Sequence, residues 1–304
     1  MRILITGARG FIGSHIVKAL LQPPGRHELH GLSRIPGPTK LGTLLTTHVG
    51  DVTDPPTLPA ACSGIEVIIH CVQFPNHPIE NPRKGWTYLR VDGEGTRNLV
   101  NAAKAAGVRR FIYLSGLGVG PDRAEPWFRA KWMAESAIRQ SGMEYVIFRP
   151  SLVYGPEDRS ANRFLQMIAR LPVIPVIGNG RQRIQPVFVD ELAELVAKAV
   201  DLPAATNQVF DVGGTETYTF DDFLRTLARS QDKRCRLIHI PKAIAKAAAF
   251  PLQWLPTPPL TPGAVDFLTM DAVADTRATQ EVFGWTQRPL VENLPRHIQV
   301  KAPH

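Results

Sequence analysis

Eight residues close to the N-terminus read Thr6-Gly7-Ala8-Arg9-Gly10-Phe11-Ile12-Gly13 and space three glycines three residues apart. An apolar run, residues 2–6, precedes them, and an amphipathic run, residues 11–22, follows. Between a strand and a helix, such glycines allow a tight turn, close approach of the backbone to a pyrophosphate, and close helix–strand packing. Backbone N–H groups and the positive end of the helix then face the anion. The pattern predicts a dinucleotide-binding turn, with a glycine-rich turn that binds no ligand as the alternative; the predicted contacts are Gly7, Arg9, Gly10, Phe11, Ile12 and Gly13.

Beyond this turn, short apolar runs alternate with longer amphipathic ones. The predicted strands are residues 2–6, 28–33, 46–50, 66–72, 109–114 and 144–148, and the predicted helices are residues 11–22, 56–62, 85–106 and 123–141. Gly107 stands where the third of these helices should stop. The alternation is typical of βαβ units. We therefore expect an α/β protein with a Rossmann-type, doubly wound parallel sheet.

The pattern changes after Arg149-Pro150, where the predicted elements become shorter and the turns denser. Helices are predicted at residues 162–171 and 190–200 and from Thr219 onward, strands at residues 173–177, 186–189 and 209–212, and Asp190 is the expected N-cap of its helix. Five prolines from Pro251 to Pro262 argue against a helix or a central strand there. We expect an NAD(P)-binding domain over residues 1–150 and a smaller C-terminal α+β substrate lobe over residues 151–304, with sheet elements returning to the first domain.

The end of the second predicted strand bears on the choice of cofactor. NAD-binding proteins usually place Asp or Glu there, next to the ribose 2′-OH. This chain has Ser33-Arg34 instead, and Arg34 together with Arg9 could hold a 2′-phosphate through forked donors. The residues favour NADP(H) over NAD(H). Asp51-Val52, after the third strand, is expected near the adenine, and a helix N-cap role for Asp51 is the alternative.

Composition narrows the class of protein. The chain has 304 residues, 44% of them hydrophobic and 20% charged, which excludes disorder, collagen-like repeats and coiled coil. Lys and Arg number 35 against 27 Asp and Glu, so the formal charge of +8 favours anionic partners such as nucleotides. No nucleic-acid-binding motif occurs, and nucleic acid is not an expected partner.

Cysteine usage and hydropathy indicate where the protein works. Cys62, Cys71 and Cys235 are far apart and odd in number, so they indicate neither a disulfide framework nor a metal site. The first residues leave no room for a secretion signal, and no apolar run approaches the roughly 20 residues of a membrane span. We expect a cytoplasmic protein, and peripheral attachment to the inner face of a membrane stays open.

The chain resembles the extended or atypical short-chain dehydrogenases/reductases of the NAD-dependent epimerase/dehydratase superfamily. The resemblance runs nearly end to end, through Thr6–Gly13, Gly50-Asp51-Val52-Thr53-Asp54, Gly95-Thr96-Arg97-Asn98-Leu99, Arg149-Pro150-Ser151-Leu152-Val153-Tyr154-Gly155-Pro156 and Pro186-Val187-Phe188-Val189-Asp190. Residues 258–262 and 270–273 resemble the branch that includes the nucleotide-binding accessory subunit of respiratory complex I. The resemblance implies a Rossmann fold binding NAD(P)(H). It also implies chemistry by a Ser, a Tyr and a Lys, in which Lys lowers the Tyr pKa and holds the ribose.

The residues expected at this catalytic site depart from the family pattern. Lys131 fits, but Trp127 stands four residues earlier, in place of the Tyr, and an indole N–H does not exchange its proton near neutral pH. Gly116 aligns with the catalytic Ser, and Ser115 is one position too early, on the opposite face of a strand. Lys131 is interpreted as a partner of the nicotinamide ribose, or alternatively as an exposed helix lysine.

Other residues have weaker functional interpretations. Tyr154 is the one nearby hydroxyl that could replace the missing acid, although a packing tyrosine is the commoner case. Cys71 and Val72, at the end of the strand 66–72, and Pro150 are expected at the edge of the cofactor site. Trp127, Phe128 and Trp132 could cover a flat, quinone-like or other small organic substrate, although aromatic residues on a helix are usually core. Four arginines make the loops of the second lobe basic: Arg159, Arg163, Arg181 and Arg183.

Two hypotheses follow from these residues. In the first, the protein is an NADP(H)-preferring oxidoreductase that protonates its substrate through water, Tyr154 or the substrate itself. In the second, it is a non-catalytic, nucleotide-bound accessory, assembly or redox-sensing protein of a membrane redox complex. Standard epimerase or dehydratase chemistry is disfavoured because it depends on the missing tyrosine.

Overall fold

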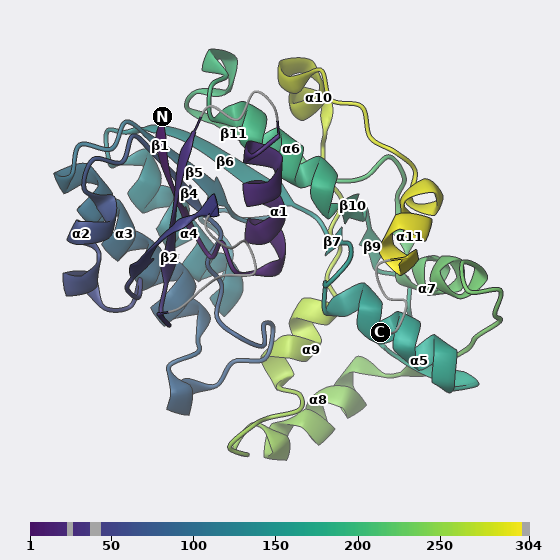
Figure 1. The fold of residues 1–304 in the computed structure, drawn as a ribbon. Coiled ribbons are helices and arrows are strands. Elements are labelled where there is room, and N and C mark those ends of the chain that lie inside the picture. The colour runs from purple at the N-terminus through teal and green to yellow at the C-terminus, as the bar shows by residue number, and fades with distance from the viewer. Residues whose placement is uncertain (23–26, 37–43, 300–304) are drawn as a thin grey trace.

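A seven-stranded parallel sheet lies at the centre of the part of the chain that this computed structural model describes, residues 1–22, 27–36 and 44–299 (Figure 1). Its strands, in spatial order, are β3 (Thr46–Val49), β2 (Glu28–Ser33), β1 (Arg2–Thr6), β4 (Val67–His70), β5 (Arg110–Leu114), β6 (Glu144–Pro150) and β11 (Gln208–Val212). Every residue of β4 and β5 is buried, as expected for strands covered on both faces. The predicted Rossmann-type sheet is confirmed.

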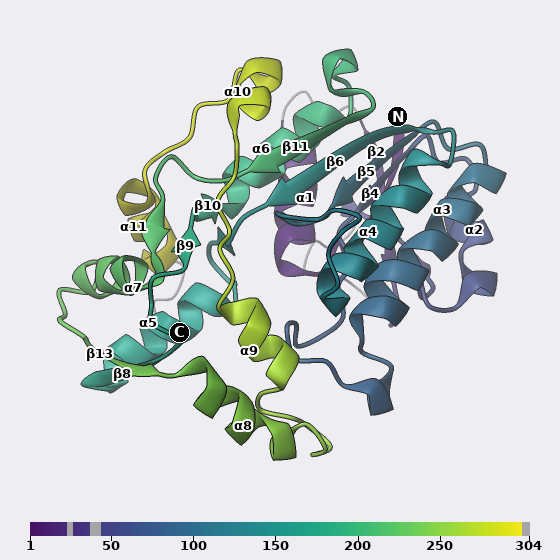
Figure 2. The ribbon, with the colours of Figure 1, turned by 180° about the vertical axis from the view of Figure 1, so that it is seen from behind.

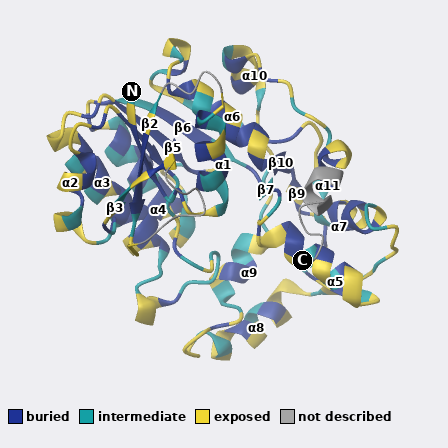
Figure 3. Cartoon of the chain, in the orientation of Figure 1, coloured by how far each residue is buried: buried dark blue, intermediate teal, exposed yellow. Residues whose placement is uncertain are grey.

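Helices cover both faces of this sheet. α1 (Phe11–Leu20) and α6 (Val189–Ala199) lie on one face, and α2 (Pro59–Cys62), α3 (Gly95–Ala105) and α4 (Pro126–Arg139) lie on the other, as Figures 1 and 2 show from opposite sides. Each layer has its own hydrophobic core, one formed with α1 and α6 and the other with α2, α3 and α4. Figure 3 shows the strands buried between these layers and the outer helix faces exposed.

The C-terminal half contributes both to the sheet and to a separate group of elements. β11 pairs with β6, and α10 (Arg277–Phe283) adds Phe283 to the core beside it. The other elements are β7 (Val153–Tyr154), α5 (Ser160–Arg170), β8 (Val173–Ile177), β9 (Arg183–Ile184), β10 (Val187–Phe188), β12 (Tyr218–Thr219), α7 (Phe220–Arg229), β13 (Arg236–Ile240), α8 (Lys242–Leu252), α9 (Pro262–Leu268) and α11 (Leu290–Gln299). Three two-stranded sheets, β7–β10, β8–β13 and β9–β12, join them. The boundary at residue 150 stays a prediction.

The prediction of a long helix over residues 85–106 is wrong for its first three residues, 85–87. Gly85 has a left-handed φ of 67° and follows the short 3-10 turn η3 (Pro82–Lys84). The helical chain begins only after Thr87, whose side chain accepts a hydrogen bond from the Arg90 N–H at 3.2 Å. A π-helical segment, η4 (Tyr88–Glu94), then leads into α3. The predicted stop is correct, because Gly107 has a φ of 75° directly after the helix.

Two smaller predictions in the second half need correction. Pro251 lies inside α8, so the proline-dense stretch begins as the last turn of a helix. Asp190 is not an N-cap, because α6 already begins at Val189. Its carboxylate instead lies 2.5 Å from Nδ1 of His15, a buried residue of α1, and so joins the two helices on that face of the sheet.

The described residues include no helix that is both long and apolar enough to cross a membrane.

Candidate functional site

The glycine-rich turn between β1 and α1 is shaped by backbone contacts that exclude side chains. The Gly10 N–H donates to the Gly7 oxygen at 2.8 Å, and Gly7 has a φ of 78°. A Cβ at Gly13 would lie 2.2 Å from the Gly7 oxygen, and one at Gly7 would lie 3.0 Å from the Cys71 oxygen. The turn therefore packs directly onto the chain after β4, and α1 begins at Phe11 with open N–H groups. This backbone cradle fits a dinucleotide pyrophosphate.

Two predicted cofactor residues meet at the end of β2. The Arg9 guanidinium donates from Nη1 to Ser33 Oγ and to the Ile35 oxygen, each at 3.2 Å. Ser33 Oγ also donates to the Ile35 oxygen at 2.9 Å. Arg34 is exposed directly beside this contact. A guanidinium and a hydroxyl, followed by a second arginine, thus stand where an NAD-preferring protein offers a carboxylate.

The remaining predicted cofactor residues lie along the same edge of the sheet, with separate structural roles. Asp51 Oδ1 accepts hydrogen bonds from the N–H and the hydroxyl of Thr53 at 2.8 and 2.9 Å, which closes a local turn after β3. Asp51 is not a helix N-cap, because the 3-10 turn η2 (Pro55–Thr57) that follows has Asp54 at that position. The Val52 oxygen accepts from Asn98. Val72 and Pro150 are partly buried, and Pro150 ends β6. Burial raises the pKa of the Cys71 thiol to about 12, so it stays protonated at neutral pH.

Lys131 is buried on α4 and is not an exposed helix lysine. Its ammonium lies 3.0 Å from Asp92 Oδ1, donates to the Leu114 oxygen at 3.4 Å, and stands 5.2 Å from the ring centre of Tyr113. Burial alone would lower the pKa of Lys131, but Tyr113 and Asp92 outweigh it, so the pKa is raised and the ammonium form is kept. Asp92 is therefore the counter-ion of Lys131.

Trp127 and Gly116 fit each other closely. A Cβ at Gly116 would lie 2.5 Å from the indole atoms Cη2 and Cζ2. The two positions where the sequence predicts departures from the family pattern thus form one packing arrangement, in which the indole takes space beside residue 116. The indole Nε1 is buried and has no hydrogen-bond partner among the described residues.

Ser115 is committed to another cluster. Its hydroxyl donates to Glu135 Oε1 at 2.7 Å, and Glu135 is fully buried. Arg149 binds both oxygens of that carboxylate, at 2.9 and 2.7 Å, and Arg139 binds Oε2 at 2.7 Å. The structure therefore places Ser115 in a buried ionic cluster that holds α4 against β6, and does not bring it to Lys131.

Tyr154 lies apart from Lys131, in the core of the C-terminal half. It is buried at 1% exposure and packs at 5.5 Å from the Phe188 ring. Burial raises the pKa of its hydroxyl, and a hydrogen bond involving Asn293 works against the rise. This is the environment of a packing tyrosine, and it counts against Tyr154 as the substitute acid.

Sequence reasoning missed two residues that complete the surroundings of Trp127. His77 and Phe267, from the loop after β4 and from α9, have ring centres 4.7 Å apart, and Phe267 lies 5.2 Å from Trp127. Phe74 and Tyr88 also pack against His77, with ring centres 5.7 and 5.5 Å away. These five residues form what we call the aromatic cluster. No local pattern marked His77 or Phe267, because the cluster assembles from segments about 190 residues apart.

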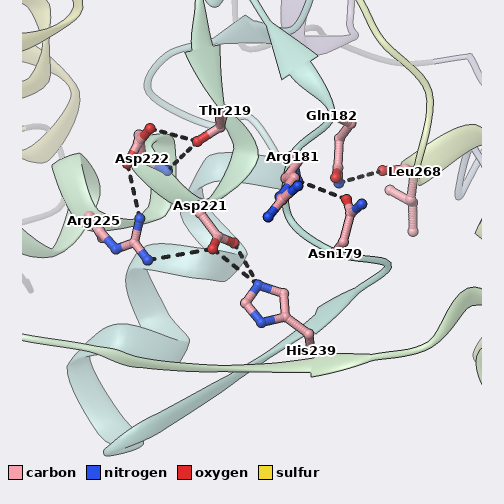
Figure 4. A network of polar contacts seen from close by, with 9 residues as sticks. All are labelled: Asn179, Arg181, Gln182, Thr219, Asp221, Asp222, Arg225, His239 and Leu268. Atoms are coloured by element: carbon pink, nitrogen blue, oxygen red, sulfur yellow. Dashed lines mark hydrogen bonds and ion pairs between the residues drawn. The ribbon is translucent and has the colours of Figure 1, made fainter.

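A second region of polar residues lies in the C-terminal half (Figure 4). It lines an open cavity of about 1140 Å³. His239 Nε2 lies 3.0 Å from both oxygens of Asp221, which Arg225 also contacts at 3.5 Å. Arg181 lines this cavity, whereas Arg183 is paired with Asp271 at 2.9 Å. Acidic groups thus balance part of the positive charge predicted for these loops. No group of three or more metal-ligating side chains occurs in the described part of the chain.

The fold and the glycine turn define an α/β protein of the Rossmann type with a dinucleotide-binding turn. The sequence model of the NAD dependent epimerase/dehydratase family matches residues 3–213, and the chain belongs to this family. It is 30% identical over 240 residues to the ceramide reductase of Caulobacter vibrioides, covering 79% of this chain and 73% of that protein.

Other relatives have different roles. The mitochondrial NADH dehydrogenase (ubiquinone) 1 alpha subcomplex subunit 9 of Arabidopsis thaliana is 26% identical over 258 residues, which cover 83% of this chain and 63% of that protein. Among solved structures, the UDP-glucuronic acid 4-epimerase of Bacillus cereus in complex with UDP-glucuronic acid and NAD superimposes with a TM-score of 0.77. It is 20% identical, with 98% of both chains covered, a likeness that shows the fold.

Proposed function

We propose that the protein binds NADP(H) in preference to NAD(H) and is an oxidoreductase with an altered Ser-Tyr-Lys site. The observation that carries the cofactor assignment is the contact of Arg9 with Ser33 beside the exposed Arg34. A 2′-phosphate placed at the end of β2 would meet two guanidinium groups and a hydroxyl, and no carboxylate follows Ser33 in residues 34–36.

Lys131 supports binding and orientation of the nicotinamide half. Asp92 fixes the position of the Lys131 ammonium, which must be fixed if it is to donate a hydrogen bond to a ribose hydroxyl. Bound NADPH supplies a hydride. The tyrosine beside Lys131, Tyr113, is fully buried on β5, and burial raises its pKa to about 12. No tyrosine stands one turn before Lys131 on α4, so the proton that completes carbonyl reduction would come from water. The aromatic cluster suits an apolar, carbonyl-containing substrate, and the similarity to a ceramide reductase favours the same class.

The test of the cofactor assignment is calorimetric titration with NADPH and NADH. We expect NADPH to bind at least about tenfold more tightly, because charge-assisted bonds to a phosphate contribute about 1.5–3 kcal/mol. Arg34→Ala and Arg9→Ala should narrow the difference by weakening NADPH alone. Arg170→Ala, an exposed arginine at the end of α5, is the matched control and should change neither affinity. Equal affinities of the unmodified protein for both cofactors would overturn the assignment.

A second candidate function is that of a nucleotide-bound accessory, assembly or redox-sensing protein of a membrane redox complex, attached to the inner face of the membrane. The packing of Trp127 against Gly116 favours it, because the indole leaves no space for a serine side chain at that position. The similarity to a complex I subunit supports the same proposal. Affinity purification from membranes should then recover redox-complex subunits, and their absence would count against this function.

A further inference from the structure

The outward face of α8 and of the turn after it is apolar along its whole length. Its exposed residues follow helical spacing: Ala243, Ile244, Ala247, Ala248, Phe250, Pro251, Trp254 and Leu255. Three of them are large and open to solvent, since Ile244, Phe250 and Trp254 are exposed at 60, 55 and 57%. A surface helix normally turns polar residues outward, and a contiguous exposed apolar patch marks an interaction site.

Packing on the opposite side of α8 keeps this face outward. Ala245 and Ala249 are buried and form a small core with Val265 of α9. At the end of the helix, the rings of Phe250 and Trp254 pack against each other with centres 4.9 Å apart. The apolar face is therefore a fixed part of the fold, and it ends in an exposed pair of aromatic rings.

Positive charge borders the first turns of this face. Lys242 and Lys246 share a single carboxylate, that of Asp266, and each ammonium lies 2.9 Å from one of its oxygens. Two cations against one anion leave a surplus positive charge. No Asp or Glu occurs from residue 242 to residue 265, so no other carboxylate of this segment opposes that charge.

A second basic group lies beyond the other end of the face, on η3. Asn81, directly before η3, donates from its side chain to the Pro256 oxygen at 2.8 Å and so joins the two segments. Arg83 and Lys84 are exposed on η3. Figures 1 and 2 show α8 and the blue turn η3 at the same, lower end of the molecule. Basic groups therefore border the apolar face at both of its ends.

The chemistry of this surface favours a lipid bilayer over a protein partner. A protein interface carries about one hydrogen bond per 100–200 Å², whereas the exposed residues of the face offer one side-chain donor, the Trp254 indole N–H. A second copy of this chain would bring the same basic groups against each other in a symmetric pair. An anionic bilayer accepts apolar side chains, attracts the basic groups and holds tryptophan at the level of its head groups.

We propose that α8 and η3 bind the surface of an anionic lipid bilayer, with the apolar face in the head-group region and Arg83, Lys84 and Lys242 facing the lipid charges. A helix of 11 residues is about 16 Å long, against about 30 Å for the hydrocarbon core, so α8 lies along the surface. None of these residues belongs to the cofactor site, and the inference goes beyond NADP(H) binding. For the second candidate function, it supplies the surface of attachment.

The first experiment is co-flotation of the whole protein with vesicles of defined lipids. Phosphatidylcholine vesicles with about one third phosphatidylglycerol carry negative charge, and pure phosphatidylcholine vesicles do not. We expect the protein to float with the anionic vesicles at low salt and to bind the neutral vesicles at least about tenfold more weakly. High salt should reduce this difference, because it screens the charges.

Variants test the apolar and the basic part of the surface separately. Phe250→Ser combined with Trp254→Ser removes the aromatic pair and should weaken binding to both kinds of vesicle at least about tenfold. Arg83→Gln combined with Lys84→Gln removes two charges and should weaken binding to the anionic vesicles alone, about tenfold.

Matched controls change residues of similar exposure elsewhere in the molecule. Val291→Ser, at a residue of α11 with 56% exposure, is the control for Phe250 and Trp254. Arg277→Gln combined with Lys198→Gln changes two exposed basic residues on α10 and α6, away from α8 (Figure 1), and is the control for the basic pair. Both controls should bind vesicles like the unmodified protein.

Tryptophan fluorescence shows whether α8 itself enters the bilayer. Lipids with brominated acyl chains quench a tryptophan that they contact, and we expect them to quench the protein. Trp254→Phe keeps an apolar ring, so it should float normally with the anionic vesicles but lose most of the quenching. Trp132→Phe, on α4, is the control and should keep it.

Three results would overturn the inference: no binding to anionic vesicles, full binding after the double change at Phe250 and Trp254, or quenching that does not depend on Trp254. Self-association that the same double change abolishes, in a protein that does not bind vesicles, would also overturn it and assign the face to a second copy. NADPH affinity is measured by calorimetry on every variant. Normal NADPH binding without vesicle binding contradicts this inference alone, and vesicle binding without NADPH binding contradicts the cofactor assignment alone.

Discussion

The glycine turn and the Trp127 end of α4 face the same edge of the sheet, yet they are built in different ways. The turn is backbone packed on backbone, with glycines at positions where a Cβ would lie 2.2 to 3.1 Å from another main-chain atom. The Trp127 region is built from side-chain packing, in which the indole of Trp127 occupies the space beside Gly116. The backbone cradle and the packing of Trp127 thus involve different residues, so each can be changed without the other.

The largest effect is expected from a methyl group in the turn. In Gly13→Ala, the new Cβ would lie 2.2 Å from the Gly7 oxygen, where only main-chain movement can relieve the overlap. We expect the free energy of unfolding to fall by about 3 kcal/mol, the upper end for overpacking. NADPH affinity, measured by calorimetry, should fall at least about a hundredfold.

Gly263→Ala is the matched control for this variant. Gly263 lies in the first turn of α9, and a Cβ there would meet no atom within 4 Å. Alanine is the better helix former by about 0.5–1 kcal/mol, so stability should be unchanged or slightly higher and cofactor binding normal. Should Gly13→Ala behave like this control, the turn would not be the rigid cradle described above.

An intermediate effect is expected from introducing, one at a time, the serine at position 116 and the tyrosine at position 127 that the family resemblance implies. Gly116→Ser alone places a Cβ 2.5 Å from the indole of Trp127 and should lower the free energy of unfolding by about 2 kcal/mol. The same change in a Trp127→Tyr background removes the obstacle. The double variant should therefore be more stable than the sum of the single changes predicts, by about 1 kcal/mol.

A double-mutant cycle by urea unfolding measures this coupling. Gly120→Ser, at a nearby glycine with no atom within 4 Å of its Cβ position, controls for the introduction of a serine. If the effects of the Gly116 and Trp127 changes on the free energy of unfolding were strictly additive, the two residues would not be coupled. The Trp127 region would then not be held together by this side-chain packing.

The fold was predictable from sequence because its signals are local. Buried parallel strands appear as short apolar runs, and a helix stop needs a single glycine such as Gly107. The prediction failed at residues 85–87, where a left-handed Gly85 and the capping Thr87 delay the helix, and at Asp190, whose partner His15 lies 175 residues away. The entry into η4 depends on the local conformation of Gly85 and the cap by Thr87, whereas the role of Asp190 depends on a contact with a distant segment.

The candidate site was predictable only where the main chain or a fixed spacing defines it. The spacing of the glycines predicts the turn, and the separation of four residues between Trp127 and Lys131 predicts that they share one face of a helix. The partner of Ser115 could not be predicted from sequence. Its hydroxyl binds Glu135, whose carboxylate is held in a buried cluster by Arg139 of α4 and Arg149 of β6. His77 and Phe267 come into contact because α9 packs against the first domain, and sequence periodicity does not predict this tertiary contact.

His70 connects the two regions, and its titration should produce the smallest effect. Thr96 Oγ1 donates to the Asp92 oxygen at 2.6 Å, so it must accept from His70 Nε2–H at 2.9 Å. The other ring nitrogen, Nδ1, then accepts from Thr6 Oγ1 at 2.5 Å. This chain of bonds, from the end of β1 to the main-chain carbonyl of Asp92, requires a neutral ring. Burial, and then the charge of Lys131, accordingly lower the pKa of His70 to about 3.

The sign of the pH dependence follows from this lowered pKa. Below a pH of about 6.5, the unfolded-state pKa, His70 is protonated in the unfolded chain but stays neutral in the folded protein. The free energy of unfolding therefore falls as the pH falls toward 3. Between pH 7.5 and 5.5 this loss amounts to about 1 kcal/mol. In His70→Gln, an amide can bridge the same two threonines without titrating, so its urea-unfolding free energy should fall less over this range, by that amount. Other histidines titrate equally in both proteins and cancel in the difference. An identical fall in the two proteins would show that His70 takes up its proton in the folded state, and that the two regions are not joined through a neutral imidazole.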